Sequence, residues 1–292
     1  MHPYTFPLHD SLLNYAPLIQ IHRWFQFYEH PNTNLSNQLA LFSENIHIKS
    51  RFDESRGYEA YKERVSKISP QWINAHHIQQ VELKQIDYRT IELNLDIIYQ
   101  NIGYLPNEQL TNTPLHYRTK LAVENMQQLP RFTEIIIEES QLDIPSGYEQ
   151  FISSYPEHRI RTLIYYFCTL FDSKLPSAEG FKDIFSSEID ISLPTAQCTN
   201  FEDFTTWFQE RPAQMLQSKH VLDSLNINAI APNSYQVSFE FSWSGASKIH
   251  PETPLAARTL HQWIVIDNPS EAFARIQTMS VQTLPCKIAA IA

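Results

Sequence analysis

The chain has 292 residues, of which 42% are hydrophobic and 18% are charged, as in an ordinary folded protein. Its formal net charge of −10 argues against nucleic acid and anionic membrane surfaces as partners, because both attract basic proteins. The sequence shows neither an apolar segment of membrane-spanning length nor the basic start and apolar run of a signal peptide. We therefore expect a cytoplasmic protein.

Cysteine and glycine exclude further classes of protein. The cysteines, Cys168, Cys198 and Cys286, are scattered without a CxxC pair, which favours reduced thiols. The five glycines lie too far apart to form the phosphate-binding loop of a P-loop or dinucleotide-binding fold. The metal-binding motif HExxH and the nucleophile motif GxSxG do not occur. The sequence therefore predicts neither a metal nor a cofactor.

The first half of the chain begins with helical patterns and continues with strand patterns. We expect, in order, a helix with apolar residues at Leu18, Ile21, Phe25 and Tyr28, a short helix ending at Phe42, a strand containing Ile46 and Ile48, and a helix over Tyr58–Ser66. The apolar period then changes to two. A strand should open near His77 and be followed by the strands Ile91–Tyr99, Leu115–Val123 and Phe132–Ile137.

The second half repeats this order. Phe42–Ile48 and Phe185–Ile191 are similar at an offset in residue number of 143 (185 − 42), and the same offset pairs Trp24–Tyr28 with Phe167–Phe171. The repeated elements are a helix with Ile160, Leu163, Phe167 and Leu170, a short helix ending at Phe185, a strand with Ile189 and Ile191, a helix over Phe201–Gln209, and strands from His220 and over Tyr235–Trp243, Leu255–Val265 and Phe273–Ser280. We predict two copies of one domain, residues 1–143 and 144–292.

A second repeat lies in the later strands. "TPLHYRT" (Thr113–Thr119) and "TPLAART" (Thr253–Thr259) stand at an offset of only 140 (253 − 113), which we attribute to a shorter loop in the second copy. The two segments should form the same strand in both copies. Gly103 and Gly245 should close the long central strands at equivalent points, where a bulge or tight turn needs glycine.

Helices followed by consecutive strands indicate an α+β fold, with three helices packed on a curved antiparallel sheet in each copy. In element order, in the pattern F-S-x-x-I-x-I and in the histidine that opens the long strand, each copy resembles the nuclear transport factor 2-like superfamily. The similarity is greatest to its SnoaL-like branch of polyketide cyclases, dehydratases and steroid isomerases. This resemblance implies cone-shaped domains. It also implies pairing through the open sheet faces, here as an intrachain pseudo-dimer, with a further homodimer left open.

The resemblance also implies a ligand pocket between the helices and the concave face of the sheet. Dehydratases of similar fold have a catalytic histidine where His77 and His220 stand, and His76 should point the opposite way, toward solvent. Steroid isomerases carry a hydrogen-bond donor near His261, whose counterpart in the first copy would be Leu121. An isolated histidine is otherwise a structural residue, so both interpretations stay open.

Other parts of the family's catalytic sets are incomplete. The isomerase carboxylate falls at Ser50 and Leu193, so that only Asp53, three residues further on, is available. Tyrosines of the first helices are possible hydrogen-bond donors, although aromatic residues at helical spacing are usually core. The candidate catalytic residues are His220, His261 and Tyr165, and the candidate ligand-binding residues are His77, Tyr28, Trp24, Tyr166 and Trp263.

Two functions remain open at this point. The chain is either a non-catalytic module that binds a small, largely apolar ligand, or a cofactor-independent lyase, isomerase or cyclase. In the second case His220 would be the general acid or base acting on a small carbonyl compound. Exposure of His220 to a second polar group across an apolar space would favour the enzyme.

Overall fold

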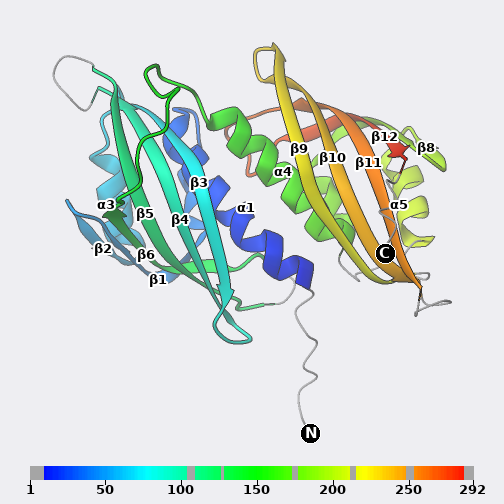
Figure 1. The fold of residues 1–292 in the computed structure, drawn as a ribbon, viewed down its shortest axis with the longest axis horizontal. Helices are drawn as coiled ribbons and strands as arrows, with labels where there is room; N and C mark the ends of the chain where they lie inside the picture. Colours follow the sequence, from blue (N-terminus) through cyan, green and yellow to red (C-terminus); the bar gives the residue numbers. More distant parts are fainter. Residues whose placement is uncertain are drawn as a thin grey trace, which may run out of the picture. The chain divides into compact units, whose positions relative to one another are not determined.

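The computed structural model describes residues 10–103, 109–125, 128–172, 177–210, 215–247 and 253–285 (Figure 1). The chain divides into two compact units. The first extends to Thr162 and includes Pro269–Ala272, whereas the second comprises Leu163–Asn268 and the residues from Phe273 onward. A copy boundary at residues 143 and 144 stays a prediction.

The first unit combines helices with a six-stranded sheet, and its third helix lies between the second and third strands. The helices are α1 (Asp10–Glu29), α2 (Leu35–Leu39) and α3 (Gly57–Ser66). The strands are β1 (Phe42–Lys49), β2 (Glu54–Arg56), β3 (Ile73–Gln85), β4 (Thr90–Ile102), β5 (Thr111–Ala122) and β6 (Arg131–Glu139), in the order β2-β1-β6-β5-β4-β3. The sheet is mixed rather than wholly antiparallel, because β1 and β6 run parallel.

The second unit has the same topology. Its helices are α4 (Tyr155–Asp172), whose first two turns belong to the first unit, the short 3₁₀-helix η1 (Glu179–Asp183) and α5 (Phe201–Glu210). Its strands are β7 (Phe185–Leu193), β8 (Ala196–Cys198), β9 (Met215–Ala231), β10 (Ser234–Ser247), β11 (Pro254–Ile266) and β12 (Arg275–Leu284), in the order β8-β7-β12-β11-β10-β9. Here β12 and β7 are the parallel pair.

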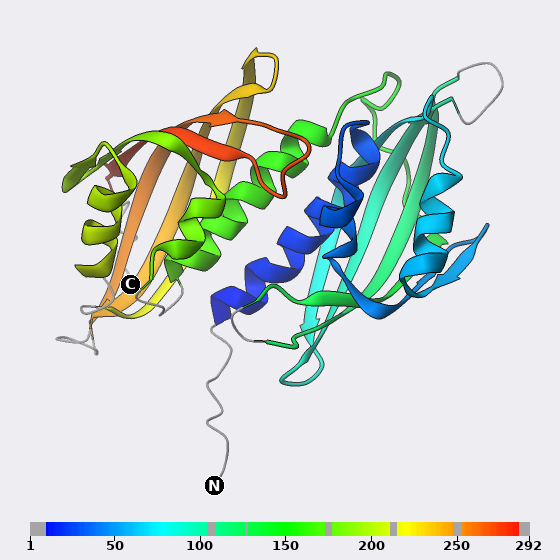
Figure 2. The same ribbon diagram turned by 180° about the vertical axis from the view of Figure 1, so that it is seen from behind.

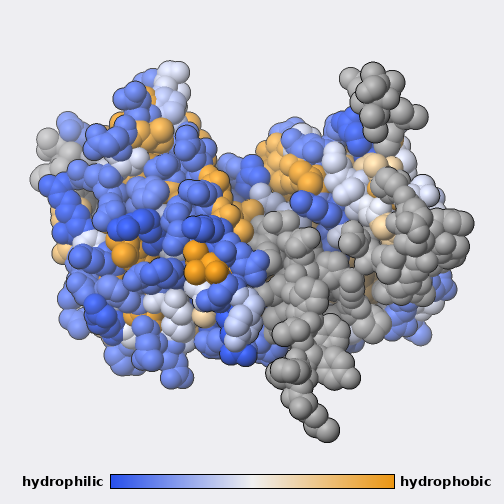
Figure 3. Space-filling model, turned by 60° about the horizontal axis from the view of Figure 1, so that its bottom comes forward, coloured by the Kyte–Doolittle hydropathy of each residue, from blue (hydrophilic) through white to orange (hydrophobic). Residues whose placement is uncertain are grey.

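Alternating burial of the strands places the core of each unit on one face of its sheet. In β4 the side chains of Ile91, Leu93, Leu95 and Ile97 are buried, whereas the intervening polar residues are only half-buried. Helices cover that apolar face in both units (Figure 2). On the molecular face shown in Figure 3, hydrophobic residues form small, separate patches among hydrophilic ones.

Strand pairing corrects the predicted drift between the copies. Leu95 pairs with Tyr117 in the first sheet and Phe239 pairs with His261 in the second, so equivalent strand positions keep an offset of 144 (239 − 95). The two TPL segments do lie in equivalent strands, β5 and β11, but four residues apart in register. The counterpart of His261 is therefore Tyr117 rather than Leu121.

The two glycines at the central strands also differ. Gly103 directly follows β4 with φ of +95°, a conformation that L-residues rarely adopt, and thus ends the strand as expected. Gly245 instead lies inside β10, where it pairs with Leu255 and Ser218. The prediction that Gly245 closes its strand is wrong.

Candidate functional site

A buried carboxylate at the end of α4 holds a histidine of β9 in the second unit. Asp172 Oδ1 lies 2.8 Å from Nδ1 of His220, and Asp172 Oδ2 accepts a hydrogen bond of 3.1 Å from the backbone N–H of the same residue. Ser218 Oγ donates to Asp172 Oδ1 over 2.6 Å. The side chain of Asp172 has no exposed surface, and that of His220 is 10% exposed. These hydrogen bonds hold the carboxylate in place, and the carboxylate in turn orients the imidazole.

The first unit repeats this arrangement at the end of α1. Glu29 Oε1 lies 2.7 Å from Nδ1 of His76 and accepts a hydrogen bond of 2.8 Å from the His76 backbone N–H. It also accepts from Ser154 Oγ over 2.9 Å and lies 3.4 Å from Nε2 of His158. Nδ1 of His158 in turn lies 2.7 Å from Nδ1 of the buried His22. The first copy of the pair is therefore embedded in a larger polar network.

An aromatic donor on the neighbouring strand is also repeated. Trp243 Nε1 on β10 donates to Ser218 Oγ over 2.9 Å. Tyr99 Oη on β4 donates to Asn74 Oδ1 over 2.5 Å. Each acceptor stands two residues before the paired histidine, and Trp243 and Tyr99 show the same offset of 144 (243 − 99) as the strand pairing. The duplication therefore extends to individual hydrogen bonds.

Charge distribution fixes the tautomer of His220. Burial alone would raise the pKa of Asp172, but the hydrogen bond and charge of His220 outweigh it and lower that pKa. An ionised carboxylate only accepts hydrogen bonds, so Nδ1 of His220 carries the proton. Nε2 makes no hydrogen bond to any described residue. It is left as the basic nitrogen.

Nonpolar rings surround His220 on the helix side of the sheet. Its ring centroid lies 5.7 Å from that of Phe171 and 5.3 Å from that of Phe241. The ring centroid of Phe241 also lies 5.0 Å from that of His261. Burial, reinforced by His220, lowers the pKa of His261 to about 3, so this imidazole is neutral near pH 7.

Two buried nitrogens of β11 lack protein partners. Nδ1 of His261 and Nε1 of Trp263 are fully buried and make no hydrogen bond to a described residue. The two side chains stand on the same face of the strand, with ring centroids 6.0 Å apart. Such buried unpaired groups are costly unless water or a ligand satisfies them. They form the polar part of the candidate site.

The predicted tyrosines of α4 point elsewhere. Tyr166 Oη donates to Asp183 over 3.1 Å, and its ring stacks on Phe273. Tyr165 stands two residues before Phe167, which packs on Trp263, so the two side chains project about 200° apart around the helix. The structure brings His220, His261 and Trp263 onto one face but places neither tyrosine beside them. Asp53 is exposed in the turn after β1.

In the first unit the two neighbouring histidines have exchanged their expected places. His76 is buried against Phe25, with rings stacked at 4.5 Å, so the prediction that it is solvated is wrong. His77 lies on the opposite face of β3, where Nε2 contacts Gln100 Oε1 at 3.1 Å and the ring contacts Tyr148. The counterpart of His220 is therefore His76.

Trp24 and Tyr28 belong to the first unit's core. Trp24 Nε1 donates to Tyr28 Oη over 3.3 Å, and that hydroxyl lies 2.8 Å from Tyr61 Oη. Gln38 Nε2 donates to Tyr61 Oη over 3.0 Å. Burial raises the pKa of Tyr28, so the hydroxyl stays protonated. In this unit the aromatic interior satisfies its own polar groups.

Glu29 and Asp172 are functional candidates that the sequence interpretation missed. The repeat was followed at a constant offset from Trp24 to Tyr28 and from Phe167 to Phe171, and the next pair of positions is Glu29 and Asp172. An acidic residue at the same helix end in both copies was the available signal.

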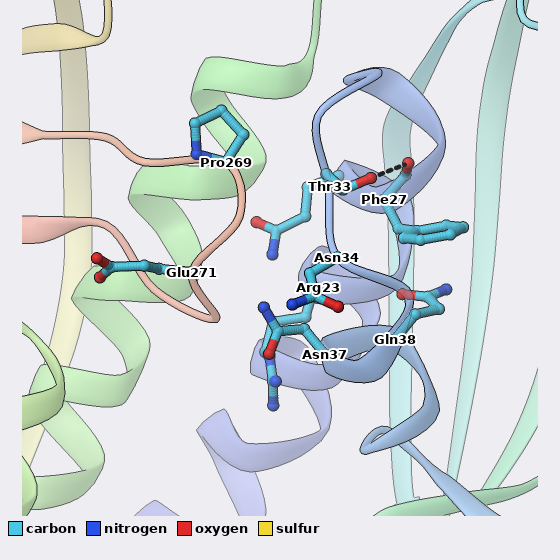
Figure 4. A pocket seen from close by; sticks show the side chains of 9 residues that line it. Arg23, Phe27, Thr33, Asn34, Asn37, Gln38, Pro269 and Glu271 are labelled. Carbon is cyan, nitrogen blue, oxygen red and sulfur yellow. Dashed lines mark hydrogen bonds between the residues drawn. The ribbon is translucent and has the colours of Figure 1, made fainter.

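A small polar pocket of about 20 Å³ lies elsewhere in the first unit (Figure 4). It is lined by Arg23, Gln26, Phe27, Thr33, Asn34, Asn37, Gln38, Pro269 and Glu271. Asn37 Nδ2 closes one side by donating to Ser270 O over 2.8 Å. The volume is enough for about one water molecule.

Other predicted features concern metals, thiols and membranes. Within the described ranges, no group of three or more His, Cys, Asp and Glu residues is arranged to hold a metal ion. Cys168 and Cys198 are free and buried, and Cys286 lies outside the described residues. None of the described helices is long and apolar enough to cross a membrane.

Comparison with known proteins gives similarity of fold only. No family model and no curated protein matches the sequence. A putative scytalone dehydratase from Novosphingobium aromaticivorans is 10% identical with a TM-score of 0.40, covering 44% of this chain and 85% of its own. A nuclear transport factor 2-like protein from Salmonella enterica is 11% identical with a TM-score of 0.40 (48% and 98% covered). An uncharacterised protein with a cystatin-like fold from Caulobacter vibrioides is 14% identical with a TM-score of 0.38 (46% and 92%).

Each unit has the helices and the curved sheet expected from the resemblance to the nuclear transport factor 2-like superfamily, together with one parallel pair of strands that was not expected from the sequence. This layout does not specify a function, because one fold supports many activities.

Proposed function

We propose that the second unit binds a small, largely apolar carbonyl compound between its helices and its sheet, and that His220 transfers a proton on this compound. The observation that carries the proposal is the buried Asp172–His220 pair, with the proton on Nδ1 and an unengaged Nε2. A carboxylate that orients a histidine in this way increases its usefulness as a general base.

The surroundings support the same substrate class. Phe171 and Phe241 offer apolar surface beside the imidazole. The unpaired Nε1–H of Trp263 is suited to donate a hydrogen bond to a carbonyl oxygen. Neutral His261, with its unpaired Nδ1, provides the second polar contact.

The chemistry proposed is elimination of water from a β-hydroxyketone. Nε2 of His220 removes the proton next to the carbonyl, the C–OH bond breaks, and a C=C bond forms. The imidazolium returns its proton to the departing hydroxide, so that water leaves and the enzyme is regenerated. Deuterium exchange at the same carbon reports the first step alone.

The test follows deuterium incorporation and dehydration of simple β-hydroxyketones by NMR in D₂O. His220→Asn and Asp172→Asn should each lower the rate, with His220→Asn reducing it about 100-fold or more. The matched control is His77→Asn. His77 lies in the first unit, on the face of β3 opposite to His76, so this variant should retain the wild-type rate. If wild-type protein binds these ketones but exchanges no proton, the protein is a binding module and the enzymatic proposal fails.

A further inference from the structure

A second hollow lies on the other face of the second unit's sheet, away from His220. Its volume is about 290 Å³, and it is lined by Asp190, Ser192, Gln197, Gln236, Gln262, Trp263, Ile264, Thr278, Met279 and Ser280. These residues come from β7, β8, β10, β11 and β12, five adjacent strands of one sheet. The volume is at the lower end of the range for small-molecule sites.

Most side chains in this hollow are polar and neutral, and five of them make no hydrogen bond to another described residue. Those of Gln236, Gln262 and Thr278 make no hydrogen bond to another described residue, and the same is true of Ser192 and Ser280. Asp190 supplies the hollow's one charge and accepts a hydrogen bond of 2.5 Å from Gln197 Nε2. Half-buried Ile264 adds apolar surface among these groups.

On the equivalent face of the first unit, charged side chains occupy the corresponding positions. Cross-strand pairing places Lys120 and Glu134 where the second unit has Ile264 and Thr278. Lys120 Nζ lies 2.7 Å from Glu134 Oε1, and His47 Nδ1 lies 3.9 Å from Glu134 Oε2. Here the long charged side chains satisfy one another, whereas shorter neutral ones leave a hollow in the second unit.

We propose that this hollow is a binding site for a neutral, hydroxyl-rich ligand of one or two sugar rings. Glutamine amides and serine or threonine hydroxyls both donate and accept hydrogen bonds, as sugar hydroxyls do. The hollow has no cation to recognise phosphate or carboxylate, and Asp190 disfavours anions. Ile264 provides an apolar contact for the C–H face of a sugar ring.

The test is saturation-transfer NMR on the full chain with glucose, galactose, maltose and cellobiose, with glucose 6-phosphate as the charged comparison. The double variant Ile264→Lys/Thr278→Glu introduces the ion pair that the first unit has at the same positions. It should weaken neutral-sugar binding at least tenfold while the circular dichroism spectrum stays unchanged. The reverse exchange in the first unit, Lys120→Ile/Glu134→Thr, is the control and should leave binding unaltered.

A single substitution provides a second test in case the double variant fails to fold. Gln236→Glu replaces one exposed amide by the residue of the equivalent first-unit position, Glu92, and should weaken binding of the same sugars without affecting the fold. The proposal is overturned if wild-type protein binds none of the four sugars, if glucose 6-phosphate binds as well as glucose, or if the folded variants retain wild-type affinity.

Discussion

At the level of single residues, the sequence indicates the buried role for His77, whereas the structure places His76 in the core. Neighbouring strand residues point to opposite faces, so a one-residue shift moves a side chain from the core to the other side of the sheet. The pairs Glu29–His76 and Asp172–His220 are 47 and 48 residues apart, respectively. The second copy therefore contains one extra residue before β9, which a repeat read at a constant offset cannot reveal.

Glu29 supports a first prediction about stability. Glu29→Gln should lower the free energy of unfolding by about 3 kcal/mol, because it removes the buried negative charge on which the contacts of His76, His158 and Ser154 with Oε1 converge. Burial alone would raise the pKa of Glu29, but His158 and His76 lower it to about 2. The stabilisation is thus complete above about pH 4.5 and is lost as the pH falls toward 2.

Urea unfolding at several pH values measures this effect. The control is Glu63→Gln on α3, where Glu63 forms a solvent-exposed ion pair with Lys67 and should lower the free energy of unfolding much less than Glu29→Gln does. Equal losses in the two variants at pH 7 would contradict the role assigned to Glu29.

His261 leads to a second prediction, on pH dependence. Its pKa is about 3 in the folded protein, against an ordinary value of 6.5, so the unfolded chain binds the extra proton between these values. The wild-type protein should lose stability as the pH falls from 6.5 toward 3. His261→Phe preserves a ring against Phe239 but removes this component, so its stability relative to wild type should improve with acidification.

Thermal or urea unfolding of both proteins from pH 8 to pH 4 provides the comparison. Any packing difference between the two proteins appears as a pH-independent offset between their stability curves. Parallel stability curves throughout this range would show that His261 is not held neutral by the fold.

At the level of elements, Gly103 allows a test of strand termination. Gly103 and Gly147 both have φ above +90°, so alanine should cost each about 1–3 kcal/mol of backbone strain. A Cβ at Gly103 would also lie 3.0 Å from Gln71 O, whereas one at Gly147 would meet nothing within 4 Å. Gly103→Ala should therefore destabilise the protein more than Gly147→Ala in urea unfolding, and equal costs would exclude the Gln71 contact as a cause.

Element order was predictable because burial on one face imposes an apolar period, and that period survives in one sequence. The apolar residues at helical spacing that end at Tyr28 and at Leu170 do lie in helices, and the alternating segments do lie in β4 and β10. The strands β2 and β8, of three residues each, are too short to show a period. The parallel pairing of β1 with β6 is also a long-range property that local pattern does not contain.

The candidate site was less predictable than the elements. His261 and Trp263 were proposed from the alternation of their strand, and His220 from the family resemblance at the start of the long strand. Asp172 was missed because its role depends on where a helix end meets a strand 48 residues later. Local sequence shows neither the distance between Asp172 and His220 nor the direction in which their side chains point.

At the level of the whole molecule, the duplication has preserved topology while the surfaces have diverged. Both units retain the carboxylate–histidine pair and its aromatic neighbour strand. On the outer sheet face, Lys120 and Glu134 form an ion pair in the first unit, whereas the second unit has the neutral Ile264 and Thr278 at the same positions. Each unit can therefore serve as a control for the other. A residue that occurs at a position of one unit can be introduced at the equivalent position of the other unit.

The parallel pair in each sheet has a consequence for the order of events during synthesis. Phe42 at the start of β1 pairs with Phe132, and Phe185 at the start of β7 pairs with Ile276, so most of a unit's chain separates the partners. Contacts at such separation slow folding, because a long loop must close before they form. During synthesis, one edge of β1 and one edge of β7 therefore stay unpaired until almost the whole unit has left the ribosome. An unpaired strand edge is prone to aggregation, so this is the interval in which chaperone binding should matter most.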